Sequence, residues 1–230
     1  MGNHCSMTSF PFAGPLFRDR REAGKRLAAA LAARRFEQGL VVGLARGGIE
    51  VAAEVASALG VPLDALAVRK VGHPAQPEYA IGAVTPGGGA FVRGHDGLSD
   101  ADVEAAVAAA GRKAEELDRT LHAERPALDV ARATAILVDD GLATGATMSA
   151  AVRWARRAGA KRVIVAVPVG VEETVAALAA EADQVVCLEQ PALFGAVGLW
   201  YEHFPQVSDE RVVEVLAGST VEHPPGRPLA

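Results

Sequence analysis

Short apolar runs alternate with segments of helical length along most of this chain. The runs are apolar throughout rather than alternating between apolar and polar residues, a pattern typical of strands buried on both faces. Because segments of about 10–15 residues with helical periodicity separate them, neighbouring strands are expected to run parallel. The sequence therefore predicts an α/β fold in which helices cover both faces of a central parallel sheet. The expected strands are residues 40–44, 63–68, 133–138, 161–167 and 184–188.

The expected helices lie between these strands and at both ends of the set. Ser99 and Ser208 are their clearest N-caps, because a serine hydroxyl accepts a hydrogen bond from a free backbone N–H of the first turn. Residues 69–79 are interpreted as a loop rich in glycine, proline and charge, followed by a hairpin of residues 80–84 and 90–93. The expected helices are residues 18–36, 49–59, 99–123, 147–158, 172–182 and 208–216.

Charge and cysteine content narrow the class of protein. With 28 acidic and 23 basic residues, the formal net charge is -5 at pH 7, which disfavours a general nucleic-acid binder. Cys5 and Cys187 are too few for a disulfide framework or a four-ligand zinc site. No apolar run reaches the roughly 20 residues of a membrane span, and no signal peptide is recognised. A cytoplasmic protein without a membrane partner is expected.

The chain length of 230 residues suits one large domain or one domain with a small accessory lobe. Residues 1–15 and 218–230 lack periodicity and are expected to form an irregular N-terminal arm and an irregular tail. The domain itself is predicted to span residues 16–217.

The most informative loop follows the strand at residues 133–138 and reads Asp-Asp-Gly-Leu-Ala-Thr-Gly-Ala-Thr from Asp139 to Thr147. Ligands of parallel sheets bind beyond the carboxyl ends of the strands. Free N–H groups at a helix start attract a phosphate where small side chains let it approach. The two carboxylates just upstream suit ribose hydroxyls or the hydration shell of a metal. The loop thus predicts a phosphorylated-sugar site; the plainer alternative is a strand–turn–helix whose aspartates only cap the backbone.

Residues 136–147, Ile-Leu-Val-Asp-Asp-Gly-Leu-Ala-Thr-Gly-Ala-Thr, resemble the phosphoribosyl pyrophosphate (PRPP) motif of type I phosphoribosyltransferases. The order of strands and loops is similar from about residue 18 to residue 215, most of all to a little-described bacterial group. The resemblance implies the family fold with a small hood lobe, contributed here mainly by residues 189–207. It also implies Mg2+-dependent transfer of ribosyl 5-phosphate from PRPP to a nitrogenous acceptor, with release of pyrophosphate, in nucleotide metabolism.

The same resemblance assigns roles to particular residues. Asp139 and Asp140 hold the 2- and 3-hydroxyls of the ribose. The 5-phosphate loop comprises Ala143, Thr144, Gly145, Ala146 and Thr147. The loop after the first strand resembles the family's pyrophosphate loop and comprises Ala45, Arg46, Gly47 and Gly48. Its glycines permit unusual backbone geometry and its arginine supplies charge; the alternative is a glycine turn with a surface arginine.

A second cation is expected at Lys70, where the family often places a basic residue near the pyrophosphate, ahead of a mobile loop. The alternative is a solvated surface lysine. Glu78 is interpreted as a surface or capping carboxylate rather than a Mg2+ ligand or a base, and no direct metal ligand is assigned. The expected catalytic residues are Asp139, Asp140, Lys70 and Arg46.

An aromatic-rich stretch at residues 191–201 follows the last strand. In the family such segments help to build the hood over the acceptor, so Phe194, Trp200 and Tyr201 are candidates for stacking on an acceptor ring. The alternative is that these rings fill a small accessory core.

The acceptor itself stays open beyond a nitrogen heterocycle. Ala143 stands where the 6-oxopurine enzymes have an acidic residue, and no segment matches the base-recognition segments of the purine, uracil or orotate enzymes. Water or a sugar-modifying partner is an alternative acceptor, and a non-catalytic PRPP- or nucleotide-binding regulator is an alternative function. A homodimer is expected only because relatives often dimerise. No Gly-x-Gly-x-x-Gly motif follows the first strand, which argues against a dinucleotide-dependent dehydrogenase. Residues 141–147 contain no lysine, which argues against a P-loop NTPase.

Overall fold

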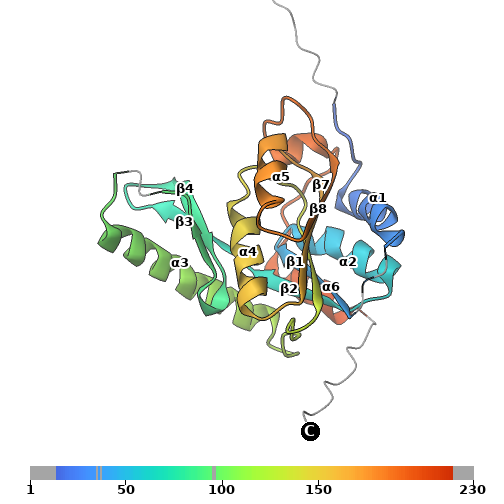
Figure 1. Ribbon diagram of the computed structural model, residues 1–230, viewed down its shortest axis with the longest axis horizontal. Coiled ribbons are helices and arrows are strands. Elements are labelled where there is room, and N and C mark those ends of the chain that lie inside the picture. Colours follow the sequence, from blue (N-terminus) through green and yellow to red (C-terminus); the bar gives the residue numbers. More distant parts are fainter. Residues whose placement is uncertain (1–13, 35, 37, 95–96, 220–230) are drawn as a thin grey trace, which may run out of the picture.

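Two sheets organise the part of the chain that the computed structural model describes, residues 14–34, 36, 38–94 and 97–219. In the larger sheet, all strands are parallel and lie in the order β2-β1-β6-β7-β8 (Figure 1). The predicted α/β fold with a central parallel sheet is confirmed. Most of the predicted arm and tail falls in residues 1–13 and 220–230, outside the described residues. The strands are β1 (Gly39–Ala45), β2 (Leu63–Ala67), β6 (Thr134–Val138), β7 (Arg162–Val169) and β8 (Gln184–Glu189).

Alternate residues of these strands enter two hydrophobic cores, one on each face of the sheet. Val41 and Ile136 pack with α1, α2 and α6, whereas Val42 and Leu137 pack with α4 and α5. Both faces of the sheet are thus covered by apolar side chains, which explains why the strands do not alternate between apolar and polar residues. The helices are α1 (Arg20–Ala32), α2 (Gly48–Leu59), α3 (Asp100–Leu121), α4 (Ala146–Arg157), α5 (Glu172–Leu178) and α6 (Asp209–Ala217). None of the described helices has both the length and the apolar character needed to span a membrane.

The helix starts follow their capping side chains. Ser99 Oγ accepts from Asp102 N, and Ser208 Oγ accepts from Arg211 N, so both predicted caps are confirmed. The first helix begins at Arg20 rather than at residue 18 because Asp19 is its N-cap.

A smaller antiparallel sheet, in the order β3-β4-β5, forms an accessory lobe with α3 beside the main sheet (Figure 1). The hairpin of β4 and β5 was expected, but the loop predicted over residues 69–79 is wrong. That segment forms β3 and the start of β4, because Val71 is buried against Ile81 and Ala110. This local core outweighs the turn-forming composition. The strands are β3 (Arg69–His73), β4 (Gln76–Val84) and β5 (Ala90–Val92), with the turn η1 (Pro86–Gly88).

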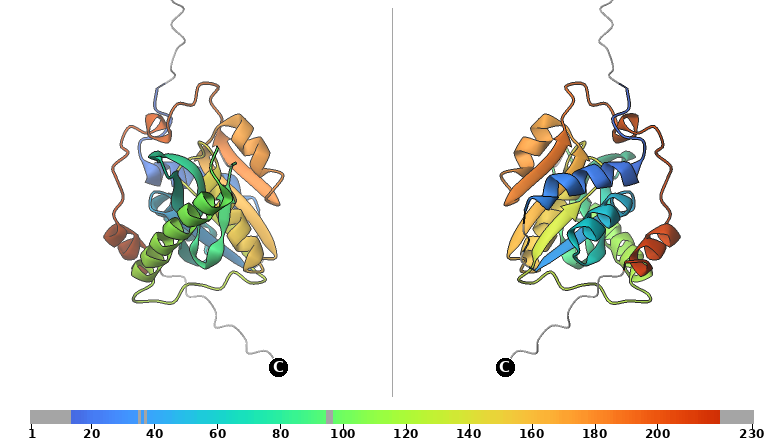
Figure 2. Two further views of the ribbon diagram at one scale, coloured as in Figure 1. Left: turned by 90° about the vertical axis from the view of Figure 1, so that its left-hand side faces the viewer. Right: turned by 90° about the vertical axis from the view of Figure 1, so that its right-hand side faces the viewer.

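The segment expected to contribute most of the hood, residues 189–207, runs along the outside of the molecule from β8 to α6 (Figure 2). It contains the short helix η2 (Val197–Trp200) and packs on the residues that precede α1: Phe17 N donates to Trp200 O, and Glu202 N donates to Phe17 O.

A buried histidine fixes the end of α3 against β2. His122 Nε2 lies 3.1 Å from Asp64 Oδ1, and His122 Nδ1 lies 3.2 Å from Asp118 Oδ1. Hydrogen bonds with Asp118 and then Asp64 raise the pKa of His122 from 6.5 to about 10. The charged imidazolium therefore stabilises the junction between the accessory lobe and the main sheet.

We predict that replacing His122 with Gln lowers the unfolding free energy by an amount that depends on pH. Because the folded pKa lies above the unfolded one, the stabilisation is complete below pH 6.5 and is lost as the pH rises through about 10. The variant should lose about 2 kcal/mol of unfolding free energy near pH 6, and the difference from wild type should shrink toward high pH. Urea unfolding at a series of pH values measures this; a difference independent of pH would contradict it.

Candidate active site

The loops that follow β1 and β6 meet because these strands are neighbours, with Gly43 opposite Val138. A Cβ atom at Gly47 would lie 2.1 Å from Asp140 Oδ2, and one at Gly48 would lie 2.7 Å from the Val138 carbonyl oxygen. The predicted pyrophosphate loop and the acidic pair are therefore in contact, and only glycine permits so close an approach at both positions.

The acidic pair is held by a network of hydrogen bonds. Asp140 N donates to Asp139 Oδ1 at 2.9 Å, and Arg20 Nε donates to Asp140 Oδ2 at 2.8 Å. The Tyr201 hydroxyl donates to the Asp140 carbonyl oxygen at 2.5 Å. Strand β6 thus delivers both carboxylates, while α1 and the segment of residues 189–207 fix the second one.

Arg20 is the site residue that the sequence analysis missed. It stands at the start of a helix among other charged residues, and nothing in the local sequence separates it from a solvent-exposed arginine. One signal was available: a cation in the first turn of a helix is disfavoured by the helix dipole and gains from a nearby anion. The identity of that anion, 120 residues away, was not in the local sequence.

Burial makes this pair of carboxylates costly to ionise. It raises the pKa of Asp139 well above the ordinary value, and the charge of Asp140 raises it further, while Arg20 and Lys70 act in the opposite direction. Burial also raises the pKa of Asp140, opposed mainly by Arg20. A ligand that brings hydroxyl donors or positive charge would relieve this cost.

The predicted phosphate loop, residues 143–147, leads into a helix without a side-chain cap. Gly145 precedes α4 with φ +76°, and no described side chain caps the helix start, unlike those of α1, α3 and α6. The loop is fixed from the neighbouring strand and helix, since Leu142 N donates to Val169 O and Thr174 Oγ1 donates to Ala143 O. The free N–H groups at the start of α4 can therefore receive an anion.

The two predicted cations, Arg46 and Lys70, have different surroundings. Arg46 Nε donates to Asp209 Oδ1 at 2.7 Å, so the first residue of α6 holds this guanidinium. Lys70 is exposed on β3 and close enough to lower the pKa of Asp139. The structure thus brings Lys70 to the acidic pair and engages Arg46 with a partner that the sequence analysis did not identify.

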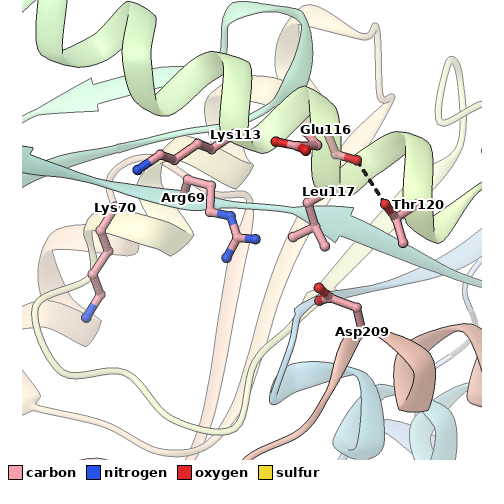
Figure 3. Close-up of a pocket in the computed structure, with 7 residues that line it drawn as sticks. All are labelled: Arg69, Lys70, Lys113, Glu116, Leu117, Thr120 and Asp209. Atoms are coloured by element: carbon pink, nitrogen blue, oxygen red, sulfur yellow. Dashed lines mark hydrogen bonds between the residues drawn. The ribbon is translucent and has the colours of Figure 1, made fainter.

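A cavity of about 570 Å³ opens between β3, α3 and α6, beside the Arg46–Asp209 pair. Figure 3 shows Arg69 and Asp209 facing the same open space, with Lys113 above them on α3. Arg69 Nε is buried without a hydrogen-bond partner among the described residues. Three cations, Arg69, Lys70 and Lys113, therefore share this cavity with the carboxylates of Glu116 and Asp209. The residues that line the cavity are Arg69, Lys70, Lys113, Glu116, Leu117, Thr120 and Asp209.

The three aromatic candidates are buried. Phe194, Trp200 and Tyr201 are 8%, 2% and 4% exposed and pack with Phe17 in one cluster. The centroid of the Tyr201 ring lies 5.4 Å from that of Phe17 and 4.9 Å from that of Phe204. Their burial favours the accessory-core alternative over stacking on an acceptor ring.

The exposed apolar side chains of this segment are instead Leu193 and Leu199. Val197, which lies between them in the sequence, packs against Gly141, the residue after the acidic pair. A Cβ at Gly141 would lie 2.5 Å from Val197 Cγ1.

Among the described residues, no three or more His, Cys, Asp and Glu side chains are grouped so that they could hold a metal ion. A divalent cation at this site would need most of its ligands from a bound phosphate compound and from water. Mg2+ is usually held in this way, through one or two carboxylates and substrate phosphates. Asp139 and Asp140 are the carboxylates that fit this pattern.

Comparison with known proteins extends these observations. The sequence matches the family model of the phosphoribosyl transferase domain over residues 19–199. A protein of Mycobacterium tuberculosis H37Rv, provisionally named a phosphoribosyl transferase, is 44% identical over 206 residues, which cover 87% of this chain and 46% of that protein. The counterpart in strain CDC 1551 aligns equally. The chain therefore spans about half the length of the curated relatives it matches.

A solved structure agrees with the fold. The crystal structure of the protein TT1426 from Thermus thermophilus has a TM-score of 0.76 and 43% sequence identity to this chain. The match covers 87% of this chain and 97% of that one.

Proposed function

This chain belongs to the phosphoribosyl transferase domain family, and from that premise we propose that it transfers ribosyl 5-phosphate from PRPP to a nitrogenous acceptor and releases pyrophosphate. The observation that carries the proposal is the contact of the glycines of residues 45–48 with Asp139 and Asp140, next to the uncapped start of α4. Sites for pyrophosphate, ribose and 5-phosphate would then follow one another in the order of the groups in PRPP.

In this proposal the phosphate loop and the acidic pair position the sugar. The N–H groups at the start of α4 bind the 5-phosphate, with the hydroxyls of Thr144 and Thr147 as further donors. Asp139 and Asp140 accept hydrogen bonds from the ribose hydroxyls. As the C1 atom gains positive character in the transition state, both carboxylates offset that charge.

The cations act on the leaving group. Arg46 and Lys70 bind the pyrophosphate and stabilise the negative charge that it gains on leaving. Mg2+, bound with the pyrophosphate, supplies further neutralisation of that charge. Most of the rate enhancement then comes from positioning and electrostatics, so a dedicated protein base is not required.

The acceptor would enter from the side of residues 189–207, the proposed hood. Val197 contacts the acidic loop there, and Leu193 and Leu199 offer exposed apolar surface. An apolar surface of this kind favours a nitrogen heterocycle as the acceptor over water, because it can pack on one face of the ring. A cytoplasmic location, a role in nucleotide metabolism and a homodimer complete the proposal.

A second candidate function is a non-catalytic PRPP-binding regulator. The observation that favours it is the ion pair of Arg46 with Asp209, which occupies the guanidinium that the transfer reaction needs. If the pair persists when PRPP is bound, the leaving group lacks one of its two proposed cations.

Calorimetric titration with PRPP, with and without Mg2+, tests the proposal, followed by a pyrophosphate-release assay with a panel of nitrogen heterocycles. We expect Mg2+-dependent binding and release with at least one heterocycle. Binding without release for any acceptor would favour the regulator. No binding of PRPP by the folded protein would overturn both functions.

Replacing Asp209 with Asn should strengthen the binding of magnesium pyrophosphate several-fold, because Arg46 no longer has a carboxylate partner. An exposed ion pair contributes up to about 1 kcal/mol, which corresponds to roughly fivefold in affinity. Titration of both proteins with magnesium pyrophosphate measures the change, and Glu214→Gln on the same helix, which pairs with Arg211 instead, is the control. Weaker binding by Asp209→Asn would show that Asp209 belongs to the ligand site rather than competing for Arg46.

A further inference from the structure

Arg20 is buried, which is unusual for a charged residue at the start of a surface helix. It is 5% exposed, and its guanidinium contacts a carboxylate, a carbonyl group and an aromatic ring. Nε donates to Asp140 Oδ2 at 2.8 Å and Nη1 donates to the Pro205 carbonyl oxygen at 2.7 Å. The guanidinium carbon lies 3.7 Å from the centroid of the Phe204 ring.

These partners come from separate parts of the chain. Asp140 follows β6, Phe204 and Pro205 belong to residues 189–207, and Arg20 opens α1. Arg20 Nη2 also lies against the pyrophosphate loop, 3.2 Å from where a Cβ at Gly47 would be. The guanidinium therefore contacts the acidic pair and the proposed hood and lies next to the pyrophosphate loop.

Geometry distinguishes the two carboxylates. Arg20 holds one oxygen of Asp140, which sets the direction of the carboxylate and leaves the other oxygen for a ligand. Asp139 has no ion pair of this kind in the described structure; its Oδ1 accepts only a backbone N–H. Loss of Arg20 would leave Asp140 as a buried carboxylate without its counter-ion, free to turn toward other donors.

We propose that Arg20 is a positioning residue, which fixes Asp140 to accept the 2-hydroxyl of the ribose and thereby sets a preference for ribose over 2-deoxyribose. The inference rests on the proposed function, since it assumes that a ribose 5-phosphate moiety binds at this site. Arg20 does not touch the ligand in this proposal. It acts through the orientation of Asp140.

The test compares the binding of ribose 5-phosphate, 2-deoxyribose 5-phosphate and inorganic phosphate by calorimetry. Wild type should prefer the ribose compound. In Arg20→Gln we expect the affinity for ribose 5-phosphate to fall about tenfold, the cost of one charge-assisted hydrogen bond. The affinity for inorganic phosphate should stay within about twofold. A loss of fold would lower all three affinities together, so the ratio between the two sugars isolates the positioning role.

Arg26→Gln is the matched control. Arg26 lies on the same helix and has the same kinds of partner: the Glu189 carboxylate, the Leu16 carbonyl oxygen and the Phe17 ring. Its replacement removes equal charge from a more exposed position away from the acidic pair, so the preference for ribose should be unchanged.

Two further variants keep the proposal falsifiable if Arg20→Gln folds poorly. Arg20→Lys keeps the positive charge but loses the planar guanidinium with its fixed donor directions, so it should retain the preference only in part. In an Asp140→Asn background, Arg20→Gln should have no further effect on the preference. Retention of the wild-type preference in a folded Arg20→Gln or Arg20→Lys protein would overturn the inference. If wild type binds neither sugar phosphate, the proposed function itself fails.

Discussion

Replacing Asp139 with Asn should make the free protein more resistant to unfolding toward high pH and lower its affinity for PRPP about 10- to 100-fold. Burial and the charge of Asp140 raise the pKa of Asp139. Because the folded pKa exceeds the unfolded one, the protonated carboxyl is the stabilising form, and this contribution is lost as the pH rises through the folded pKa. Asn carries no charge and keeps an oxygen for the hydrogen bond from Asp140 N.

The loss of binding follows from the same substitution. A hydrogen bond to a charged group contributes about 1.5–3 kcal/mol, so loss of the one from a ribose hydroxyl to the Asp139 carboxylate corresponds to about 10- to 100-fold in affinity. Thermal unfolding at several pH values and calorimetry with PRPP measure the two effects. Glu104→Gln, which removes one exposed carboxylate from α3, is the control and should change neither. An Asp139→Asn protein with unchanged PRPP affinity would remove Asp139 from the proposed site.

Replacing Gly48 with Ala should cost about 2 kcal/mol of unfolding free energy and at least about tenfold in PRPP affinity. Gly48 is the first residue of α2, where helix propensity alone favours alanine. The new Cβ would lie 2.7 Å from the Val138 carbonyl oxygen and 2.9 Å from the Asp139 Cα. Both atoms belong to the backbone at the end of a central strand, so α2 and the pyrophosphate loop must move instead.

Gly111→Ala separates the steric effect from the change of residue type. Gly111 lies in the interior of α3, and a Cβ there would meet no atom within 4 Å. This variant should gain up to about 1 kcal/mol of unfolding free energy from helix propensity and bind PRPP as wild type does. A Gly48→Ala protein that behaves like Gly111→Ala would show that the two loops are not in close contact.

The accessory lobe shows where local reasoning fails. Residues 69–79 contain glycine, proline and charged side chains, which favour a loop when read alone. They form strands because Val71 meets Ile81 and Ala110, residues that lie further along the chain. In the same way, the sequence left open whether the aromatic rings of residues 191–201 stack on an acceptor or fill an accessory core, and their burial with Phe17 favours the core.

Local patterns of residues were enough to predict the α/β class, the places of the central strands, the two serine caps and the loop that joins an acidic pair to a helix start. These features are encoded locally, by the apolar length of a strand, by capping hydroxyls and by small residues at a turn. The partners of the charged groups, in contrast, became known from the folded chain. Arg20 reaches Asp140 across 120 residues, and Arg46 reaches Asp209 across 163. No local pattern specifies such pairs, because the partner of a buried charge is set by which strand ends and helix starts the fold brings together.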